Sequence, residues 1–205
     1  MIEFKDMTFK FGDKAIFEGF NYVFEEGKVY CMMGPSGCGK STLLKLMCGL
    51  LKPTQGKVLY NGEEPRRSDR NIFMMHQTYT NFPWKNCIQN VLFPIQLHEK
   101  VTPQHVDEAQ KMLAIVGLGD CITMFPHELS GGMKQRLALA RVLVSKPKVI
   151  LMDEPLGALD PAMRLKMQDL ILQTHKEINN TIIMVTHDDN EGKRMSDTLV
   201  RLGKD

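Results

Sequence analysis

Short apolar runs and alternating segments along the chain predict an α/β protein. Residues 2–11 alternate between apolar and polar positions, and residues 20–24 place three aromatic side chains on one face, so both segments are predicted strands. Further short, mostly apolar segments bounded by turn residues predict buried strands. These segments are residues 29–33, 57–60, 72–75, 149–152, 181–186 and 198–202.

Helical periodicity dominates the middle of the chain. From about residue 78 the strand patterns stop, and apolar residues recur at helical spacing instead. Pro94 is expected to kink or shorten one of these helices. Helices are predicted at residues 41–51, 87–97, 103–116, 130–144, 161–178 and 188–195.

These elements indicate one domain, residues 1–205, with an inserted subdomain. We expect residues 1–77 and 143–205 to form an α/β core with a mixed sheet and an N-terminal antiparallel β region. We expect residues 78–142 to form a helical subdomain insert within that core.

A glycine-rich loop between a predicted strand and a predicted helix carries the strongest chemical signal. Residues 34–42 fit the pattern G-x-x-x-x-G-K-[ST], a P-loop that cradles nucleotide phosphates on its backbone N–H groups. Lys40 can reach the β- and γ-phosphates, and the Ser41 hydroxyl can bind Mg²⁺. We expect a P-loop NTPase core that binds ATP through Gly34, Pro35, Ser36, Gly37, Cys38, Gly39, Lys40, Ser41 and Thr42.

Polar side chains follow three of the predicted core strands, where open α/β sheets place their ligands. Asp153 can hold Mg²⁺, and Glu154 beside it can take a proton from an attacking water. His187 is a candidate contact for the γ-phosphate. Gln77 can orient a water or bind Mg²⁺, although spacing alone equally fits an ordinary loop glutamine.

Other readings of these residues stay open. Asp153 and Glu154 could simply face solvent at a strand end. A metal site built from residues 187–189 is a further alternative, but no partner cluster has ligand spacing.

A second candidate anion site lies in the helical segment. Ser130 is a suitable N-cap, and Gly131 and Gly132 leave the N–H groups of the following helix accessible. A single nucleotide needs only one phosphate cradle. The second site therefore suggests contact with a nucleotide held by another chain.

Taken together, these motifs resemble the ATP-binding subunits of ABC transporters over essentially the whole chain. Residues 34–42 match Walker A, Gln77 the Q-loop, residues 129–133 the signature motif, residues 149–154 Walker B, residues 158–160 the D-loop and His187 the H-loop. Met133 stands where the signature motif often has Gln.

The resemblance implies that two copies pair head to tail around two ATP molecules. In that arrangement Ser130, Gly131 and Gly132 of one copy close the P-loop of the other, and Asp160 links the two sites. Glu154 polarises the attacking water, and His187 holds the γ-phosphate. An aromatic residue near the N-terminus usually stacks on adenine in this family. Phe11 is our candidate, although it could instead be an ordinary strand aromatic.

The resemblance also implies membrane-spanning permease subunits as partners and, for an importer, a separate solute-binding protein. The helical insert docks on the permease in this family. The aromatic segment at residues 79–84, like the sequence of the P-loop, resembles the nitrate, sulfonate and taurine importers. Phe82 and Trp84 could equally pack a small core of the insert. The transported solute, the direction of transport and the choice between a homodimer and a heterodimer cannot be read from the sequence.

Composition limits the remaining possibilities. A net charge of +2 gives no argument for a nucleic-acid partner, and five cysteines without a C-x-x-C pair fit free thiols in a reducing cytosol. We find no signal peptide and no apolar run of membrane-spanning length, so we expect a cytoplasmic protein bound peripherally to the inner face of the cell membrane. The chain stops at Asp205, soon after the last predicted strand, and a minimal or a truncated version would both fit.

Two other functions compete with transport. A soluble ABC-type ATPase that remodels a non-membrane complex usually has two cassettes or long coiled-coil inserts, whereas this chain shows one cassette and no heptad run. A P-loop kinase would need a lid and an acceptor site, and the Ser130 motif argues against it. We therefore predict an ATPase that powers a transporter.

Overall fold

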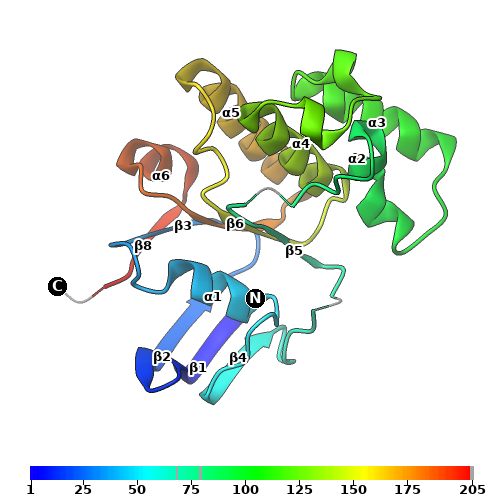
Figure 1. Ribbon diagram of the computed structural model, residues 1–205. Coiled ribbons are helices and arrows are strands. Elements are labelled where there is room, and N and C mark those ends of the chain that lie inside the picture. Colours follow the sequence, from blue (N-terminus) through cyan, green and yellow to red (C-terminus); the bar gives the residue numbers. More distant parts are fainter. Residues whose placement is uncertain (68, 79, 204–205) are drawn as a thin grey trace. The chain divides into compact units, whose positions relative to one another are not determined.

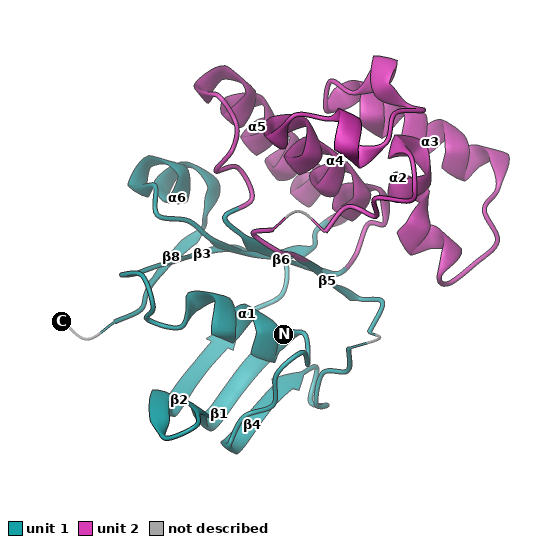
Figure 2. Cartoon of the chain, in the orientation of Figure 1, with its two compact units in different colours: residues 1–74, 148–154, 179–205 teal, residues 75–147, 155–178 magenta. Residues whose placement is uncertain are grey.

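The computed structural model describes residues 1–67, 69–78 and 80–203 (Figure 1). The chain divides into two compact units (Figure 2). Unit 1 contains residues 1–74, 148–154 and 179–205, and unit 2 contains residues 75–147 and 155–178. The predicted helical subdomain, residues 78–142, falls within unit 2, which also includes the helix at residues 161–178.

Unit 1 begins with a three-stranded antiparallel sheet in the order β2-β1-β4. β1 spans Ile2–Phe11, β2 spans Lys14–Phe24 and β4 spans Gln55–Tyr60. β2 is six residues longer than the alternation at residues 20–24 predicts, because its first half also pairs with β1. In that half Ile16 and Phe17 are partly buried against the core, so backbone pairing and this apolar contact together extend the strand.

The second sheet of unit 1 has five strands in the order β5-β6-β7-β3-β8. β3 is parallel to both β7 and β8, and β6 is parallel to β7. The three central strands are buried at every position, as expected for strands covered on both faces. The five strands are β3 (Val29–Met33), β5 (Ile72–Met75), β6 (Val149–Asp153), β7 (Thr181–Val185) and β8 (Thr198–Arg201).

Helix α1 (Lys40–Met47) packs against strands of both sheets and forms the centre of the unit 1 core. Its apolar residues Leu43, Leu44 and Leu46 are at most 1% exposed. The predicted end at residue 51 is wrong, because Gly49 adopts φ +68° and the Leu50 N–H bonds back to the Lys45 carbonyl. This turn is a glycine stop of the Schellman type.

Unit 2 is helical among its described residues. α2, α3 and α4 pack on one another, and their starts carry side-chain caps from Asn86, Thr102 and Ser130. α2 continues through Pro94 as far as Gln96. The helices are α2 (Cys87–Gln96), α3 (Pro103–Ile115), α4 (Gly131–Val144) and α5 (Pro161–Ile178), with 3₁₀ turns at Gly119–Cys121 and Pro126–Glu128.

The fold class expected from the sequence is confirmed: a P-loop core with parallel and antiparallel sheets accompanied by helices. The remaining helix, α6 (Asp189–Met195), belongs to unit 1 and follows β7. Among the helices of the described residues, none combines the length and apolarity that crossing a membrane would require.

Candidate ATP-binding and hydrolysis site

The glycine-rich loop joins β3 to α1, as the pattern of residues 34–42 predicts. Gly39 is the N-cap of α1 with φ +102°, and a Cβ there would lie 2.5 Å from the ring of Phe17, so no other residue fits. The first turn of α1 carries no acidic residue and no side-chain cap. Its N–H groups therefore keep their partial positive charge, which suits a phosphate group.

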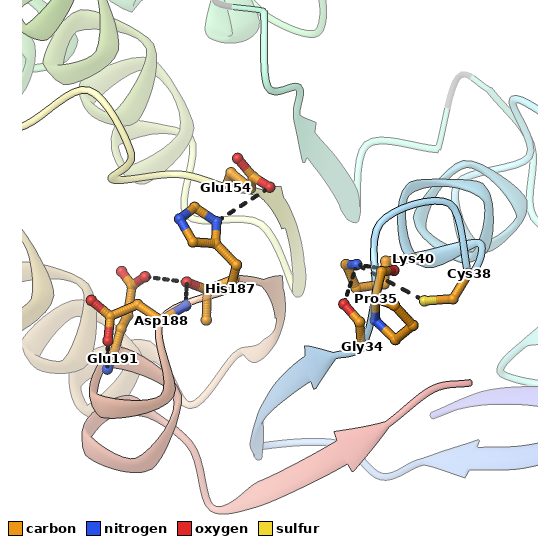
Figure 3. A network of polar contacts seen from close by, with 9 residues as sticks. Gly34, Pro35, Cys38, Lys40, Glu154, His187, Asp188 and Glu191 are labelled. Carbon is orange, nitrogen blue, oxygen red and sulfur yellow. Dashed lines mark hydrogen bonds and ion pairs between the residues drawn. The ribbon is translucent and has the colours of Figure 1, made fainter. Parts of the chain in front are cut away.

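The Lys40 ammonium group lies over this loop (Figure 3). Nζ donates hydrogen bonds to the carbonyl oxygens of Gly34 at 2.7 Å and Pro35 at 3.0 Å, and lies 3.9 Å from Sγ of Cys38. The ammonium is a point charge on a flexible stem, so it can exchange carbonyl partners for phosphate oxygens with little rearrangement.

Strand register brings three of the predicted site segments to one edge of the second sheet. Met32 of β3 pairs with Val185 of β7, and Val185 pairs with Asp153 of β6. These three residues therefore share one level across adjacent parallel strands. The P-loop, the Asp153–Glu154 pair and His187 all begin within two residues of that level, at the carboxyl ends of the strands.

Asp153 and Glu154 have different surroundings. Asp153 ends β6 and is only 6% exposed, whereas the Glu154 side chain is 29% exposed. Glu154 has φ +50°, and its N–H donates to the Val185 carbonyl at 3.0 Å. A non-glycine residue in this conformation costs about 1 kcal/mol, and such strain gathers at functional sites. The left-handed turn directs the two neighbouring carboxylates differently.

His187 faces Glu154 (Figure 3). Its Nδ1 lies 3.5 Å from Oε1 of Glu154, and its side chain is 74% exposed. The two residues are therefore adjacent although they lie on different strand ends. The alternative metal site at residues 187–189 is not supported, because no group of three or more potential ligands occurs in the described part of the chain, and Asp188 instead caps α6.

A cavity of about 580 Å³ adjoins the P-loop and is lined by residues of β2, the loop and the segment at residues 201–203. Ile16, Phe17 and Phe20 supply its apolar wall. Phe11, the predicted adenine-stacking residue, is not among the lining residues. It is 54% exposed and packs edge-to-face on Phe9, with ring centroids 4.8 Å apart.

The second candidate anion site lies within unit 2. Ser130 caps α4, and its Oγ accepts a hydrogen bond from the Met133 N–H at 3.3 Å. A side chain at Gly131 would meet nothing within 4 Å, so this helix start is open. The first turn of α4 contains no acidic residue, which leaves it suited to an anion.

The other two predicted site residues also lie in unit 2. Gln77 follows β5 by two residues. Oδ1 of Asp160 accepts a hydrogen bond from the Met163 N–H at 3.0 Å, so its carboxylate caps the start of α5 as the Asp-Pro pair predicts. The preceding turn is tied to α4, because the Ala158 N–H donates to Oε1 of the buried Gln135 at 3.0 Å.

A profile of the family described as "ABC transporter" matches residues 17–157, well over half of the chain. The chain belongs to the ABC transporter family. The "Uncharacterized ABC transporter ATP-binding protein YtlC" of Bacillus subtilis is 43% identical over 85% of this chain and 67% of its own length. The taurine import ATP-binding protein TauB of Ruegeria pomeroyi is 42% identical over 86% of this chain and 66% of its own length.

Other importer proteins are longer than the matched region. The spermidine/putrescine import protein PotA of Nitrosomonas europaea is 38% identical over 97% of this ABC cassette, which spans 56% of that relative. Among solved structures, the dimeric ABC cassette MJ0796 superposes with a TM-score of 0.89 and 30% identity over 98% of this chain and 94% of its own. The same cassette is known in a post-hydrolysis state with ADP and Pi. This chain is accordingly an ATP-binding, ATP-hydrolysing cassette.

Sequence reasoning missed several polar residues that support the site segments. Thr186 directly precedes His187, and Glu191 follows four residues later in α6; the two are 3% and 7% exposed. Arg141, 4% exposed, donates from Nη1 to the Thr80 carbonyl at 2.6 Å and lies over the Phe82 ring. Burial lowers the pKa of Arg141. The available signal was a lone charge inside the apolar run at residues 137–144.

Proposed function

We propose that this chain is the ATP-hydrolysing subunit that powers an ABC importer of a small solute. The proposal is supported by the ATPase site in unit 1 and by relatives that are named as taurine, spermidine/putrescine and Fe³⁺ import proteins. These names span chemically unrelated solutes, so the cassette alone does not select the cargo. Within that range we favour a small anion such as a sulfonate or nitrate, because the sequences of the P-loop and of residues 79–84 resemble those of the nitrate, sulfonate and taurine importers.

The observation that carries the proposal is that one chain holds two open, glycine-rich helix starts, and that their structural surroundings differ. The start of α1 follows a strand and shares a sheet edge with Glu154 and His187, whereas the start of α4 at Ser130 lies in unit 2 and follows a 3₁₀ turn. We propose that Ser130, Gly131 and Gly132 of a second copy contact the ATP held by the first. Asp160 would then connect the two sites.

The donors present suit Mg²⁺. The Ser41 hydroxyl, the Asp153 carboxylate and the Gln77 amide are hard oxygen ligands, and Asp153 is a buried acid at a strand end. When bound with ATP, Mg²⁺ would neutralise charge that develops on the phosphates. Lys40 and the N–H groups of α1 would hold the β- and γ-phosphates.

Two residues would act on the hydrolytic water and the phosphate it attacks. Glu154 would orient and deprotonate the water, a task that suits a partly exposed carboxylate. His187, directed at Glu154, would donate a hydrogen bond to the γ-phosphate. The adenine ring would stack on the exposed face of Phe11.

The permease contact would use unit 2. Trp84 is 71% exposed, whereas the neighbouring Phe82 ring packs on Phe93 with centroids 4.3 Å apart. Phe82 is half-buried by this contact, so the more exposed Trp84 is the better candidate for a docking anchor. Tyr79, also in the predicted aromatic segment, lies outside the described residues. Such docking would hold the cassette at the inner face of the cell membrane, with a solute-binding protein as an indirect partner and no role for nucleic acid.

Affinity purification from detergent-solubilised membranes tests the proposal. We expect a multi-spanning membrane protein to co-purify with the wild-type chain, and recovery to fall with Trp84→Ala but not with Leu165→Ala, another exposed apolar residue of unit 2. Recovery only in soluble complexes would favour the alternative, an ABC-type ATPase that remodels a non-membrane assembly. Uptake by proteoliposomes that contain the purified complex, assayed with a sulfonate, nitrate and a polyamine, would then identify the solute.

A further inference from the structure

His187 lies in a short connection between a strand and a helix. Its exposed side chain makes little contact that would hold the residue in place. Only residues 186–188 separate the end of β7 at Val185 from the start of α6 at Asp189. The imidazole is 74% exposed, and its Nδ1 lies 3.5 Å from Oε1 of Glu154. A side chain this exposed keeps one direction only if the backbone on both sides of it is fixed.

The Thr186 hydroxyl links the residues on the two sides of His187. It donates a hydrogen bond to Oε2 of Glu191 at 2.5 Å and accepts one from the Asp188 N–H at 3.1 Å. The donor and acceptor roles in this series of hydrogen bonds are set by its outer members, because an ionised carboxylate can only accept and an amide N–H can only donate. The hydroxyl thus joins the residue before His187 to the residue after it.

The start of helix α6 holds Asp188 and Glu191 relative to each other. Oδ1 of Asp188 accepts a hydrogen bond from the Glu191 N–H at 3.1 Å (Figure 3). It also accepts one from the Asn190 N–H at 2.9 Å. The next residue, Gly192, packs closely against β3, since a Cβ there would lie 3.1 Å from the sulfur atoms of Cys31 and Met33. Glu191 therefore stands on a turn that is itself held against the strand leading into the P-loop.

Burying Glu191 is costly for the fold. The residue is 7% exposed, and its Oε1 has no hydrogen-bond partner within the described ranges. A buried carboxylate with a single good partner is expensive compared with an apolar side chain of the same size. Its retention at this position is explained if the charge serves the loop that it anchors.

We propose that Thr186 and Glu191 are positioning residues for His187. The hydrogen-bond chain from Asp188 N–H through Thr186 to Glu191 holds the imidazole in the direction that its contact with the γ-phosphate requires. Neither residue touches the nucleotide in this scheme. The inference rests on the proposed role of His187.

Thr186→Val tests the proposal, because it keeps the shape of the side chain and removes the hydroxyl. We expect kcat for ATP hydrolysis to fall by about 10-fold or more, while the dissociation constant for ATP changes by less than about threefold. Thr186→Ser restores the hydroxyl and should recover most of the lost kcat. Thr174→Val, which removes a buried hydroxyl bonded to Leu170 in α5, is the matched control and should retain wild-type kcat.

A double-mutant cycle separates positioning from a general structural effect. If Thr186 acts through His187, adding Thr186→Val to His187→Ala should lower kcat by no more than about twofold beyond His187→Ala alone. The proposal would be overturned if the double variant lost kcat by the product of the two single-variant losses, or if Thr186→Val kept wild-type kcat. If Thr186→Val does not fold by circular dichroism, Glu191→Gln supplies the same cycle, since it keeps an acceptor oxygen but loses the charge.

The same variants test this inference separately from the proposed role of His187 in ATP hydrolysis. Full turnover by His187→Ala would remove His187 from its proposed role and the positioning inference with it. Loss of turnover in His187→Ala together with normal turnover in Thr186→Val would overturn only the inference.

Discussion

Oε1 of Glu154 lies 3.5 Å from Nδ1 of His187, so the side chains that follow β6 and β7 face each other across the strand ends. The pairing of Asp153 with Val185 makes this possible, because it sets the two strand ends at the same level. A carboxylate and an imidazole at this separation can act on one water molecule and on the phosphate that it attacks.

We predict that Glu154→Gln slows ATP hydrolysis by about 10²–10⁴-fold, the usual contribution of a general base. ATP binding should survive because the P-loop is unchanged, and ATP-bound dimers should accumulate. Single-turnover kinetics and size-exclusion chromatography with ATP measure both effects. Glu99→Gln, on an exposed residue beyond α2, is the control and should hydrolyse ATP normally. Unchanged turnover in Glu154→Gln would remove this residue from the mechanism.

Ser130→Arg should block hydrolysis while a monomer still binds ATP. The bulky cation fills the open start of α4, which we propose closes the P-loop of a second copy. Fluorescent-nucleotide titration and steady-state ATPase assays provide the two readouts. Ser130→Ala is the matched variant: it removes the N-cap, at a cost of about 1 kcal/mol in stability, without blocking the site. If Ser130→Arg abolished binding to the monomer, the shared-site arrangement would be wrong.

Phe11→Ala should weaken ATP binding by about 5–10-fold with little change in kcat, because a stacked aromatic ring contributes about 1 kcal/mol to binding. Phe11→Tyr should bind like the wild type. The affinity for free inorganic triphosphate should be the same in all three proteins, since it offers no ring to stack. Equal ATP affinities in the alanine variant and the wild type would exclude Phe11 and direct attention to Phe17 in the adjoining cavity.

The buried thiol of Cys31 predicts a loss of stability at alkaline pH. Burial, together with the charge of Glu191, raises the pKa of this thiol to about 12. Between its ordinary pKa and this value the unfolded chain ionises and the folded chain does not. The stabilising difference is therefore complete at neutral pH and is lost as pH rises, at up to about 1.4 kcal/mol per pH unit.

Urea unfolding at pH 8 and pH 10 measures this effect. Cys31→Ala should lower stability at both values but show a smaller decrease between them than the wild type. Leu165→Ala, at an exposed residue without a titratable group, should leave the pH dependence unchanged. An identical pH dependence in Cys31→Ala and the wild type would contradict the prediction.

Much of this protein was determined by local sequence. The P-loop, the acids after the buried run at residues 149–152 and the cap at Ser130 are each set within a few residues, through glycine conformations, strand ends and orphan helix N–H groups. For this reason the positions of the elements and the identity of the nucleotide site could be predicted. The end of α1 and the full length of β2 could not, because a turn hydrogen bond and a pairing strand decide them.

Only the tertiary structure decided which distant residues act together. Glu154 and His187 meet because β6 and β7 are neighbours, and Thr80 meets Arg141 because α4 packs beside the segment before α2. The Thr186–Glu191 pair was likewise invisible, since its importance comes from burial. A sequence specifies short-range geometry directly, but strand order and burial emerge from competition among all the apolar faces for one core.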